Sequence, residues 1–152
     1  MEYQPFHITV RGLVVHQGKL LLMVSKDPEN LGAIETPGGR IDKKELLINS
    51  LRRELKEELD LDLSRFENKT LLFAVNQRDE IEYGWDNETQ IMEIYYLVKI
   101  PDQVSLNIRS AENTHDLIWI ATQTNLDEFP CKLESCRKIY KDVQKALSNN
   151  TI

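Results

Sequence analysis

Residues 39–61, reading GRIDKKELLINSLRRELKEELDL, constrain the fold and function of this chain more than any other stretch. Its apolar residues recur every three or four positions, the period of an amphipathic α-helix: Leu47, Ile48, Leu51, Leu55 and Leu59. Asp42 followed by Glu45 resembles a capping box, with Asp in the Ser/Thr role. Together these features predict a helix over residues 43–59.

Three carboxylates lie together on one side of this leucine stripe. Glu54, Glu57 and Glu58 stand at positions i, i+3 and i+4, and Arg53 can pair with Glu57 one turn later. Each like-charge pair costs only about 0.2–0.5 kcal/mol on an exposed helix, which a plain solvated surface tolerates. A hard divalent cation with oxygen ligands would make the same grouping favourable. Spacing alone leaves both interpretations open, a charged solvent face or a metal site.

The fixed positions of this stretch resemble the Nudix box. That pattern is Gly, five residues, Glu, seven residues, Arg-Glu, an aliphatic, any residue, Glu-Glu, any residue, Gly and an aliphatic. The chain matches it at Gly39, Glu45, Arg53, Glu54, Leu55, Glu57, Glu58 and Leu61. The preceding residues 35–39, ETPGG, also resemble the usual lead-in of this family, with a tight turn where backbone can approach a ligand.

One fixed position departs from the family pattern. Asp60 stands where the family has the Gly that ends the helix in a left-handed conformation. Aspartate enters that conformation more easily than most other non-glycine residues. We therefore expect a slightly altered helix end with an intact carboxylate cluster.

Length and charge restrict the class of protein. A chain of 152 residues with 41% hydrophobic and 29% charged residues fits one domain with a proper core, here residues 1–152. A net charge of -6 without a basic stripe disfavours polymeric nucleic acid as a partner. We find neither a membrane-spanning apolar run nor a secretory signal, so we expect a cytoplasmic protein. Cys131 and Cys136 show no metal-binding or redox spacing.

The rest of the chain alternates between strand and loop patterns. Strands are predicted over residues 6–15, 19–24, 33–36, 70–77, 90–100 and 115–120, with Gln17-Gly18 as a hairpin turn. Residues 122–130 predict a short turn or helix. A C-terminal amphipathic helix is carried by Leu133, Cys136, Tyr140, Val143 and Leu147.

Other side chains are weaker candidates for a site. On the tip of the hairpin over residues 78–89, Tyr83 and Trp85 are placed to stack a base, or are simply exposed aromatics. Glu93 is expected to face either the site or solvent. Glu112 resembles the family segment that supplies a further acidic metal ligand. His7 and His16 are interpreted as structural or exposed, and His115 is interpreted as structural.

The order of elements gives an α+β class, and the resemblance implies a Nudix-type α/β/α sandwich with a mixed β-sheet. It also implies Mg²⁺-dependent hydrolysis of a diphosphate bond in a nucleoside diphosphate linked to another group, with Mn²⁺ as the alternative ion. The implied metal ligands are Glu54, Glu57, Glu58 and Glu112. The implied partner is a small molecule, and pairing among relatives makes a homodimer an expectation.

The remaining implied roles concern the loop and the proton. Gly38 and Gly39 let the phosphates approach, Arg53 orients the carboxylates, and Glu45 supports the loop or an outer water. Glu54 is the first candidate for general base, with Glu57, Glu93 and Glu112 as alternatives. Two other functions stay open on the same scaffold, a non-catalytic nucleotide sensor and an isoprenoid diphosphate isomerase, the latter requiring a cysteine in the site. The individual substrate is not encoded in these residues.

Overall fold

A mixed β-sheet forms the centre of the computed structural model, which describes residues 1–3, 5–79 and 89–152. Its main path runs in the order β3-β2-β1-β6-β5, with β4 paired to β1 and β7 paired to β2. The parallel pair of β1 with β6 makes the sheet mixed, since the other pairs are antiparallel. The strands are β1 Phe6–His16, β2 Lys19–Ser25, β3 Ile34–Glu35, β4 Gly38–Arg40, β5 Lys69–Asp79, β6 Gln90–Ile100 and β7 His115–Ile120.

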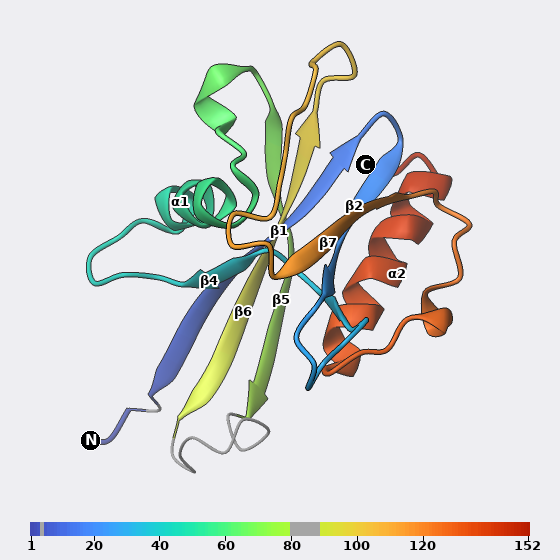
Figure 1. The fold of residues 1–152 in the computed structure, drawn as a ribbon. Coiled ribbons are helices and arrows are strands. Elements are labelled where there is room, and N and C mark those ends of the chain that lie inside the picture. The colour runs from blue at the N-terminus through green and yellow to red at the C-terminus, as the bar shows by residue number, and fades with distance from the viewer. Residues whose placement is uncertain (4, 80–88) are drawn as a thin grey trace.

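Helices lie on both sides of this sheet, as Figure 1 shows. The helices are α1 Leu47–Leu59 and α2 Glu134–Ser148, with short 3₁₀ turns η1 Leu63–Arg65 and η3 Leu126–Glu128. The leucine stripe of α1 packs on one face, where Leu51, Leu55 and Leu59 are fully buried. The opposite face packs against α2 through Tyr140 and Val143. The expected α+β class and the helix–sheet–helix layers are confirmed.

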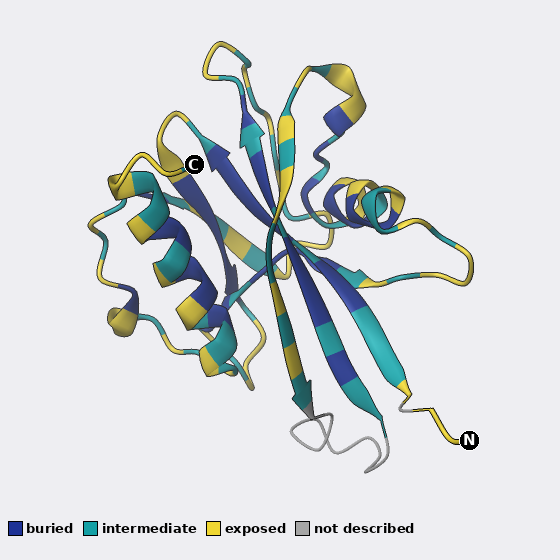
Figure 2. Cartoon of the chain, turned by 180° about the vertical axis from the view of Figure 1, so that it is seen from behind, coloured by how far each residue is buried: buried dark blue, intermediate teal, exposed yellow. Residues whose placement is uncertain are grey.

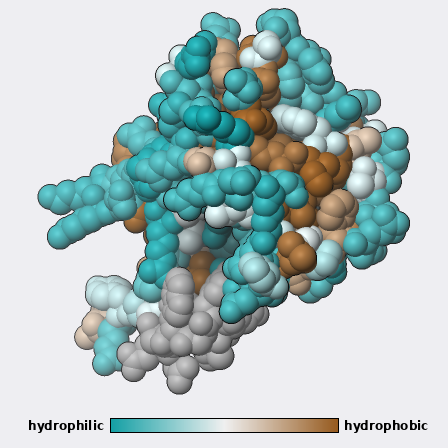
Figure 3. All heavy atoms as spheres, in the orientation of Figure 1, coloured by the Kyte–Doolittle hydropathy of each residue, from teal (hydrophilic) through white to brown (hydrophobic). Residues whose placement is uncertain are grey.

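Burial follows these layers. Strands β1, β2 and β6 are mostly buried, while the outer sides of both helices are exposed (Figure 2). Hydrophilic residues cover most of the face drawn in Figure 3, with hydrophobic ones gathered over β7 and the adjoining side of α2. Within the described ranges, no helix is long and apolar enough to cross a membrane.

The predicted hairpin between the first two strands is confirmed. Val15 pairs with Leu20 and His16 with Lys19 across a two-residue loop. Gln17 and Gly18 both have positive φ angles, 51° and 70°, as a turn that matches the twist of the strands requires. Strand β4 was not predicted, because Gly38-Gly39-Arg40 has no strand-like composition.

The predicted start of the helix at residue 43 is wrong. Helix α1 begins at Leu47, after a capping residue, Leu46, whose side chain makes no cap hydrogen bond. Half of the expected capping box does form, since the Glu45 carboxylate accepts from the Asp42 amide at 2.9 Å. Lys44 adopts a left-handed conformation with a φ of 65°, which is incompatible with a right-handed α-helix. The helix can therefore begin only after this residue.

The end of the helix meets the expectation for Asp60. This residue caps α1 in the left-handed region, with φ 53° and ψ 30°, and its amide donates to the Leu55 and Lys56 carbonyls. Its carboxylate contacts Lys56 Nζ at 2.5 Å and Arg109 Nε at 3.5 Å. These neighbours hold the pKa of Asp60 below its usual value, the Lys56 hydrogen bond contributing most.

We predict that Asp60→Gly leaves the free energy of unfolding close to that of the wild type. The glycine relieves the strain of the left-handed conformation, but it also removes exposed ion pairs whose contribution to stability is similarly small. Asp60→Ala loses the ion pairs without relieving the strain, so it should be the less stable variant. Urea denaturation of both proteins tests this, and a D60G protein clearly less stable than D60A would contradict it.

Candidate active site

The carboxylates of α1 line one cavity of about 340 Å³. Glu54, Glu57 and Glu58 face it from the helix, and Glu112 faces it from the loop before β7. Met23, Ser110, Ala111, Thr114 and His115 complete its lining. The structure thus brings together the four side chains for which the sequence indicated metal binding.

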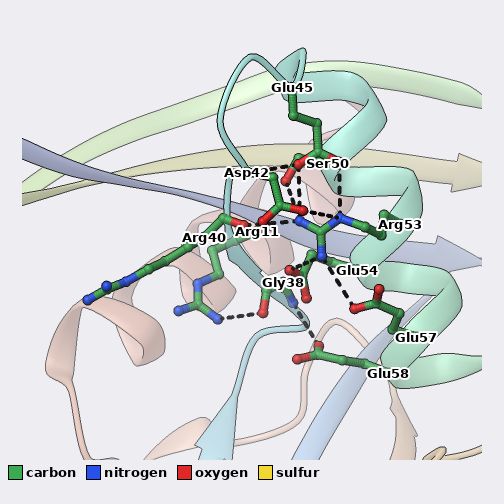
Figure 4. Close-up of polar contacts among 10 residues, drawn as sticks. All are labelled: Arg11, Gly38, Arg40, Asp42, Glu45, Ser50, Arg53, Glu54, Glu57 and Glu58. Carbon is green, nitrogen blue, oxygen red and sulfur yellow. Dashed lines mark hydrogen bonds and ion pairs between the residues drawn. The ribbon is translucent and has the colours of Figure 1, made fainter.

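The diglycine bend runs along the same helix. The Gly38 amide donates to Glu58 Oε2 at 2.8 Å, which fixes this carboxylate against the bend (Figure 4). A β-carbon on Gly39 would lie 2.5 Å from Glu54 Oε1, so only glycine leaves room for the carboxylate there. The Gly38 carbonyl in turn accepts from Arg11 Nη1 at 3.2 Å. The bend is therefore held from both sides of the sheet.

Arg53 joins the loop before α1 to the helix itself. Its guanidinium binds Glu45 through two hydrogen bonds, Nε to Oε1 at 3.0 Å and Nη2 to Oε2 at 3.1 Å. It also donates to Glu54 at 2.8 Å and to Glu57 at 3.3 Å, the latter being the predicted i+4 pair. Figure 4 shows this arginine lying between the loop and the carboxylates. Glu45 thus binds the arginine and does not line the cavity.

Arg53 favours the ionised form of Glu45. Its hydrogen bond lowers the pKa of Glu45 to about 2, and the Asp42 amide acts in the same direction. Glu45 therefore stabilises the folded state above pH 4.5, the ordinary pKa of this residue, and that stability is lost as the pH falls towards 2. The pKa of Arg53 is raised, mainly by its hydrogen bond to Glu45.

We predict that Arg53→Lys lowers the free energy of unfolding at pH 7 by ~2 kcal/mol, because an ammonium cannot reproduce the planar fork. The variant should also lose less stability than the wild type between pH 5 and pH 2. Arg52→Lys, at the exposed neighbouring position, is the matched control. Chemical denaturation across this pH range measures both effects, and equal stability of R53K and R52K would refute the prediction.

The loop before β7 is attached to the end of α1. The Arg109 amide donates to the Leu59 carbonyl at 3.0 Å, and the Ala111 amide donates to the Glu58 carbonyl at 3.1 Å. These bonds satisfy carbonyls that a helix end leaves open and bring Glu112 to the cavity. No spacing in the sequence encodes this attachment, which is why Glu112 depended on the family resemblance.

His115 is a cavity residue that sequence reasoning placed elsewhere. It was interpreted as structural, yet it lines the cavity and its Nε2 lies 2.6 Å from Glu35 Oε2. Thr114 Oγ1 lies 2.9 Å from the other ring nitrogen. A lone histidine at the start of a strand gave no signal for this position.

Folding disfavours the charged form of the Glu58 carboxylate. Burial raises its pKa to about 7, and the negative charge of Glu54 adds to this effect. The Gly38 amide and the positive field of Arg11 and His115 oppose the shift. A further positive charge in the cavity would therefore favour the ionised form of Glu58.

The donor set fits a hard divalent cation. It consists of carboxylate oxygens, one of them buried, beside a bend where Gly39 leaves space at Glu54. Glu54 and Glu57 accept hydrogen bonds from Arg53, and Glu58 accepts one from the Gly38 amide. Among residues 1–3, 5–79 and 89–152, no three acidic, histidine or cysteine side chains converge tightly enough to share one ion.

Glu93 lies away from the cavity, contrary to both expectations for it. It is buried on the α2 side of the sheet, where Arg78 Nε lies 2.6 Å and the Tyr95 hydroxyl 2.9 Å from its carboxylate. Alternation along β6 explains this, because residues 93 and 95 share the face that packs against α2. Tyr83 and Trp85 lie outside the described residues.

The cysteines required by an isomerase lie elsewhere. Cys131 and Cys136 belong to the hydrophobic cluster on the α2 side of the sheet and do not line the carboxylate cavity. This arrangement does not support the isomerase alternative. Asp60 likewise stays outside the cavity lining, so its departure from the family pattern leaves the carboxylates in place.

Solved structures share this fold. The chain is similar to a MutT NUDIX hydrolase from Burkholderia pseudomallei, with 23% identity, a TM-score of 0.61 and coverage of 79% of this chain and 86% of that one. It is similar to the dihydroneopterin triphosphate pyrophosphohydrolase of E. coli, with 13% identity, a TM-score of 0.69 and coverage of 91% and 96%.

A third similar structure is a bifunctional NMN adenylyltransferase/ADP ribose pyrophosphatase from Francisella tularensis, complexed with AMP and a manganese ion. It has 18% identity and a TM-score of 0.66, and the match covers 97% of this chain and 43% of that one. A family model for the NUDIX domain matches residues 5–134, which contain the bend, α1 and the loop with Glu112. This chain therefore belongs to the NUDIX family and is a Nudix hydrolase.

Proposed function

We propose that this protein hydrolyses a diphosphate bond in a nucleoside diphosphate linked to another group, with Mg²⁺ as the metal ion and Mn²⁺ as a substitute. The observation that carries the proposal is the cavity itself. Four carboxylates, Glu54, Glu57, Glu58 and Glu112, line this cavity, and the amide of the adjacent Gly38 binds one of them, Glu58. A structural neighbour bound to AMP and manganese supports the choice of ligand and ion.

The four cavity carboxylates are the residues that would hold the cation. A bound divalent cation neutralises diphosphate oxygens and lowers the pKa of a water molecule that attacks phosphorus. Arg53 holds Glu54 and Glu57 on the cavity side of α1, while the Gly38 amide holds Glu58. The open diglycine backbone gives the phosphates room to approach. The carboxylates are thus held in position, with their charges in place, before a substrate binds.

One carboxylate must also accept the proton of the attacking water. Glu54 is our first candidate, and Glu57 and Glu112 are the alternatives within the cavity. Glu93 is no longer a candidate, because it is enclosed by Arg78 and Tyr95. Single glutamine variants of the three remaining carboxylates separate the roles: the base variant keeps cation affinity and loses turnover, whereas a ligand variant loses both.

A substrate panel tests the proposal. ADP-ribose, dinucleoside polyphosphates, nucleotide sugars and modified nucleoside triphosphates are each incubated with the protein and Mg²⁺, and products are identified by chromatography and mass spectrometry. We expect cleavage within the phosphate chain of at least one class, abolished by a chelator. Binding of these compounds without any turnover would instead support the nucleotide-sensing alternative.

A further inference from the structure

The start of α2 brings together the two cysteines of the chain. Cys131 is partly exposed and packs against the cluster that contains Cys136, which is only 7% exposed. The Leu133 carbonyl accepts from the Cys131 thiol and, at 3.0 Å, from the Cys136 amide, so the two cysteines lie side by side. The spacing of the two residues gave no indication of this contact. It arises because the chain turns at Leu133, the residue that precedes the first turn of α2.

The surroundings of the two sulfurs differ in a way that favours a reactive pair. Cys136 is shielded, and its thiol donates to the Ile34 carbonyl at 3.5 Å. Cys131 is only partly buried, and the positive charge of Arg137 lies nearby. When protonated, its own thiol donates to the Leu133 carbonyl. The Leu133 side chain makes no cap hydrogen bond, so no side chain of the capping residue satisfies the first amides of α2. The Cys131 sulfur lies near this positive end of the helix dipole.

These contacts change the ionisation of both thiols. The neighbouring Cys136 thiol contributes most to lowering the pKa of Cys131 to about 6, and the amides of Arg137 and Leu133 act in the same direction, although partial burial opposes the shift. The hydrogen bond to Cys131 and burial raise the pKa of Cys136. An accessible sulfur that ionises easily, next to a protonated shielded one, is the usual arrangement of an attacking and a resolving thiol.

We propose that Cys131 and Cys136 form a peroxide-reactive dithiol that closes reversibly to an intramolecular disulfide. The Cys131 thiolate attacks the terminal oxygen of a hydroperoxide, the O–O bond breaks, and Cys131 becomes a sulfenic acid while the other oxygen leaves as hydroxide or alkoxide and takes a proton from water. The Cys136 sulfur then attacks the Cys131 sulfur and loses its proton, and the S–O bond breaks to release water. The two sulfurs together give two electrons to the peroxide, and a dithiol reductant reverses the change.

Oxidation would act on β3, which leads into the diglycine bend. Closing the disulfide removes the proton that Cys136 donates to the Ile34 carbonyl. The Ile34 amide is bound to the Pro130 carbonyl at 3.0 Å, directly before Cys131. The Tyr140 hydroxyl of α2 donates to the Glu35 carbonyl at 2.7 Å. We therefore expect hydrogen exchange of the β3 backbone to respond to the redox state of the pair.

The experiment exposes the full chain to one equivalent of hydrogen peroxide and measures intact mass, free thiols and amide hydrogen exchange. Cys131→Ser and Cys136→Ser are the matched variants, because each removes one sulfur and keeps a hydroxyl of similar shape. We expect the wild type to lose two hydrogens and both free thiols without dimerising, and dithiothreitol to restore them. Exchange in a peptide covering residues 32–36 should change at least threefold on oxidation.

The variants fix the order of events. Cys136→Ser should stop at the Cys131 sulfenic acid, which a dimedone probe captures, while Cys131→Ser should resist peroxide. Iodoacetamide should alkylate Cys131 at least tenfold faster than Cys136 at pH 7. Two thiols that both survive peroxide, or a disulfide that forms only between molecules, would overturn the proposal. So would an oxidised protein whose β3 exchange is unchanged. None of these readouts depends on the proposed hydrolysis.

Discussion

Replacing Glu58 with glutamine is expected to lower turnover ~100-fold or more and, in metal-free solution above neutral pH, to make the protein more stable. Both effects have one origin. The carboxylate is partly buried beside Glu54, and both burial and the Glu54 charge disfavour its ionised form. A bound cation would favour that ionised form. Glutamine keeps an oxygen that can accept from the Gly38 amide and removes the charge.

The sign of the stability change follows from the pKa of Glu58. It rises from 4.5 to about 7 on folding, so the folded state favours the protonated form. Stability from this group is fully present below pH 4.5 and is lost as the pH rises through 7. Glu58→Gln does not suffer that loss. The difference between variant and wild type should therefore grow from near zero at pH 4 to at most ~3 kcal/mol at pH 8.

Chemical denaturation of the chelator-treated proteins at both pH values measures this difference. Glu57→Gln is the matched control, because Glu57 is exposed and its substitution should change stability by less than ~0.5 kcal/mol. Adding Mg²⁺ should stabilise the wild type and have less effect on E58Q, since binding to the folded state adds to its stability. If the wild type is more stable than E58Q at pH 8 without metal, then folding does not disfavour the ionised form of Glu58, and the prediction is wrong.

Substituting alanine at the two adjacent glycines should separate folding from activity. Gly38 has a φ of 143°, and a β-carbon there would lie 2.0 Å from the Val10 carbonyl oxygen and 2.9 Å from Arg11 Cα. Neither backbone atom can move without disturbing β1, so Gly38→Ala should cost ~3 kcal/mol or more in stability.

At Gly39 the obstacle is a flexible group. The added β-carbon would lie 2.5 Å from the Glu54 carboxylate, which can swing aside on its own side chain. Gly39→Ala should therefore stay within ~1 kcal/mol of the wild type in stability and lose ~10–100-fold in turnover, because a cavity carboxylate is displaced. Thermal unfolding and turnover of both variants test the contrast. A G39A protein with full activity would mean that the position of Glu54 does not matter.

The parts of the fold that depend on local periodicity were predictable. Leucines at positions 51, 55 and 59 fixed which face of α1 is buried, and this placed Glu54, Glu57 and Glu58 beside one another. Residues 90–100 and 115–120 were predicted as strands, and β6 and β7 have these bounds. The spacing of hydrophobic residues along a helix determines which of them share a face, so the buried face could be predicted without knowledge of distant contacts.

The parts that depend on distant contacts were not predictable. The helix start was predicted too early because Lys44 adopts a left-handed backbone conformation, which lysine does not ordinarily favour and which the sequence did not indicate. Strand β4 exists only through its pairing with Val10 and Arg11. Glu112 reaches the cavity through the Arg109 and Ala111 amides, which bind carbonyls of α1. Glu93 was assigned to the wrong places, because alternation does not say which face of a strand meets which helix.

The most direct test of a cation site on α1 is manganese binding followed by paramagnetic resonance. Wild-type protein and a Glu54→Gln/Glu58→Gln double variant are titrated with Mn²⁺, and the loss of the free-ion signal gives the bound fraction. We expect saturable binding by the wild type that the double variant loses. Equal binding by the two proteins, or none by the wild type, would contradict the assignment of these carboxylates.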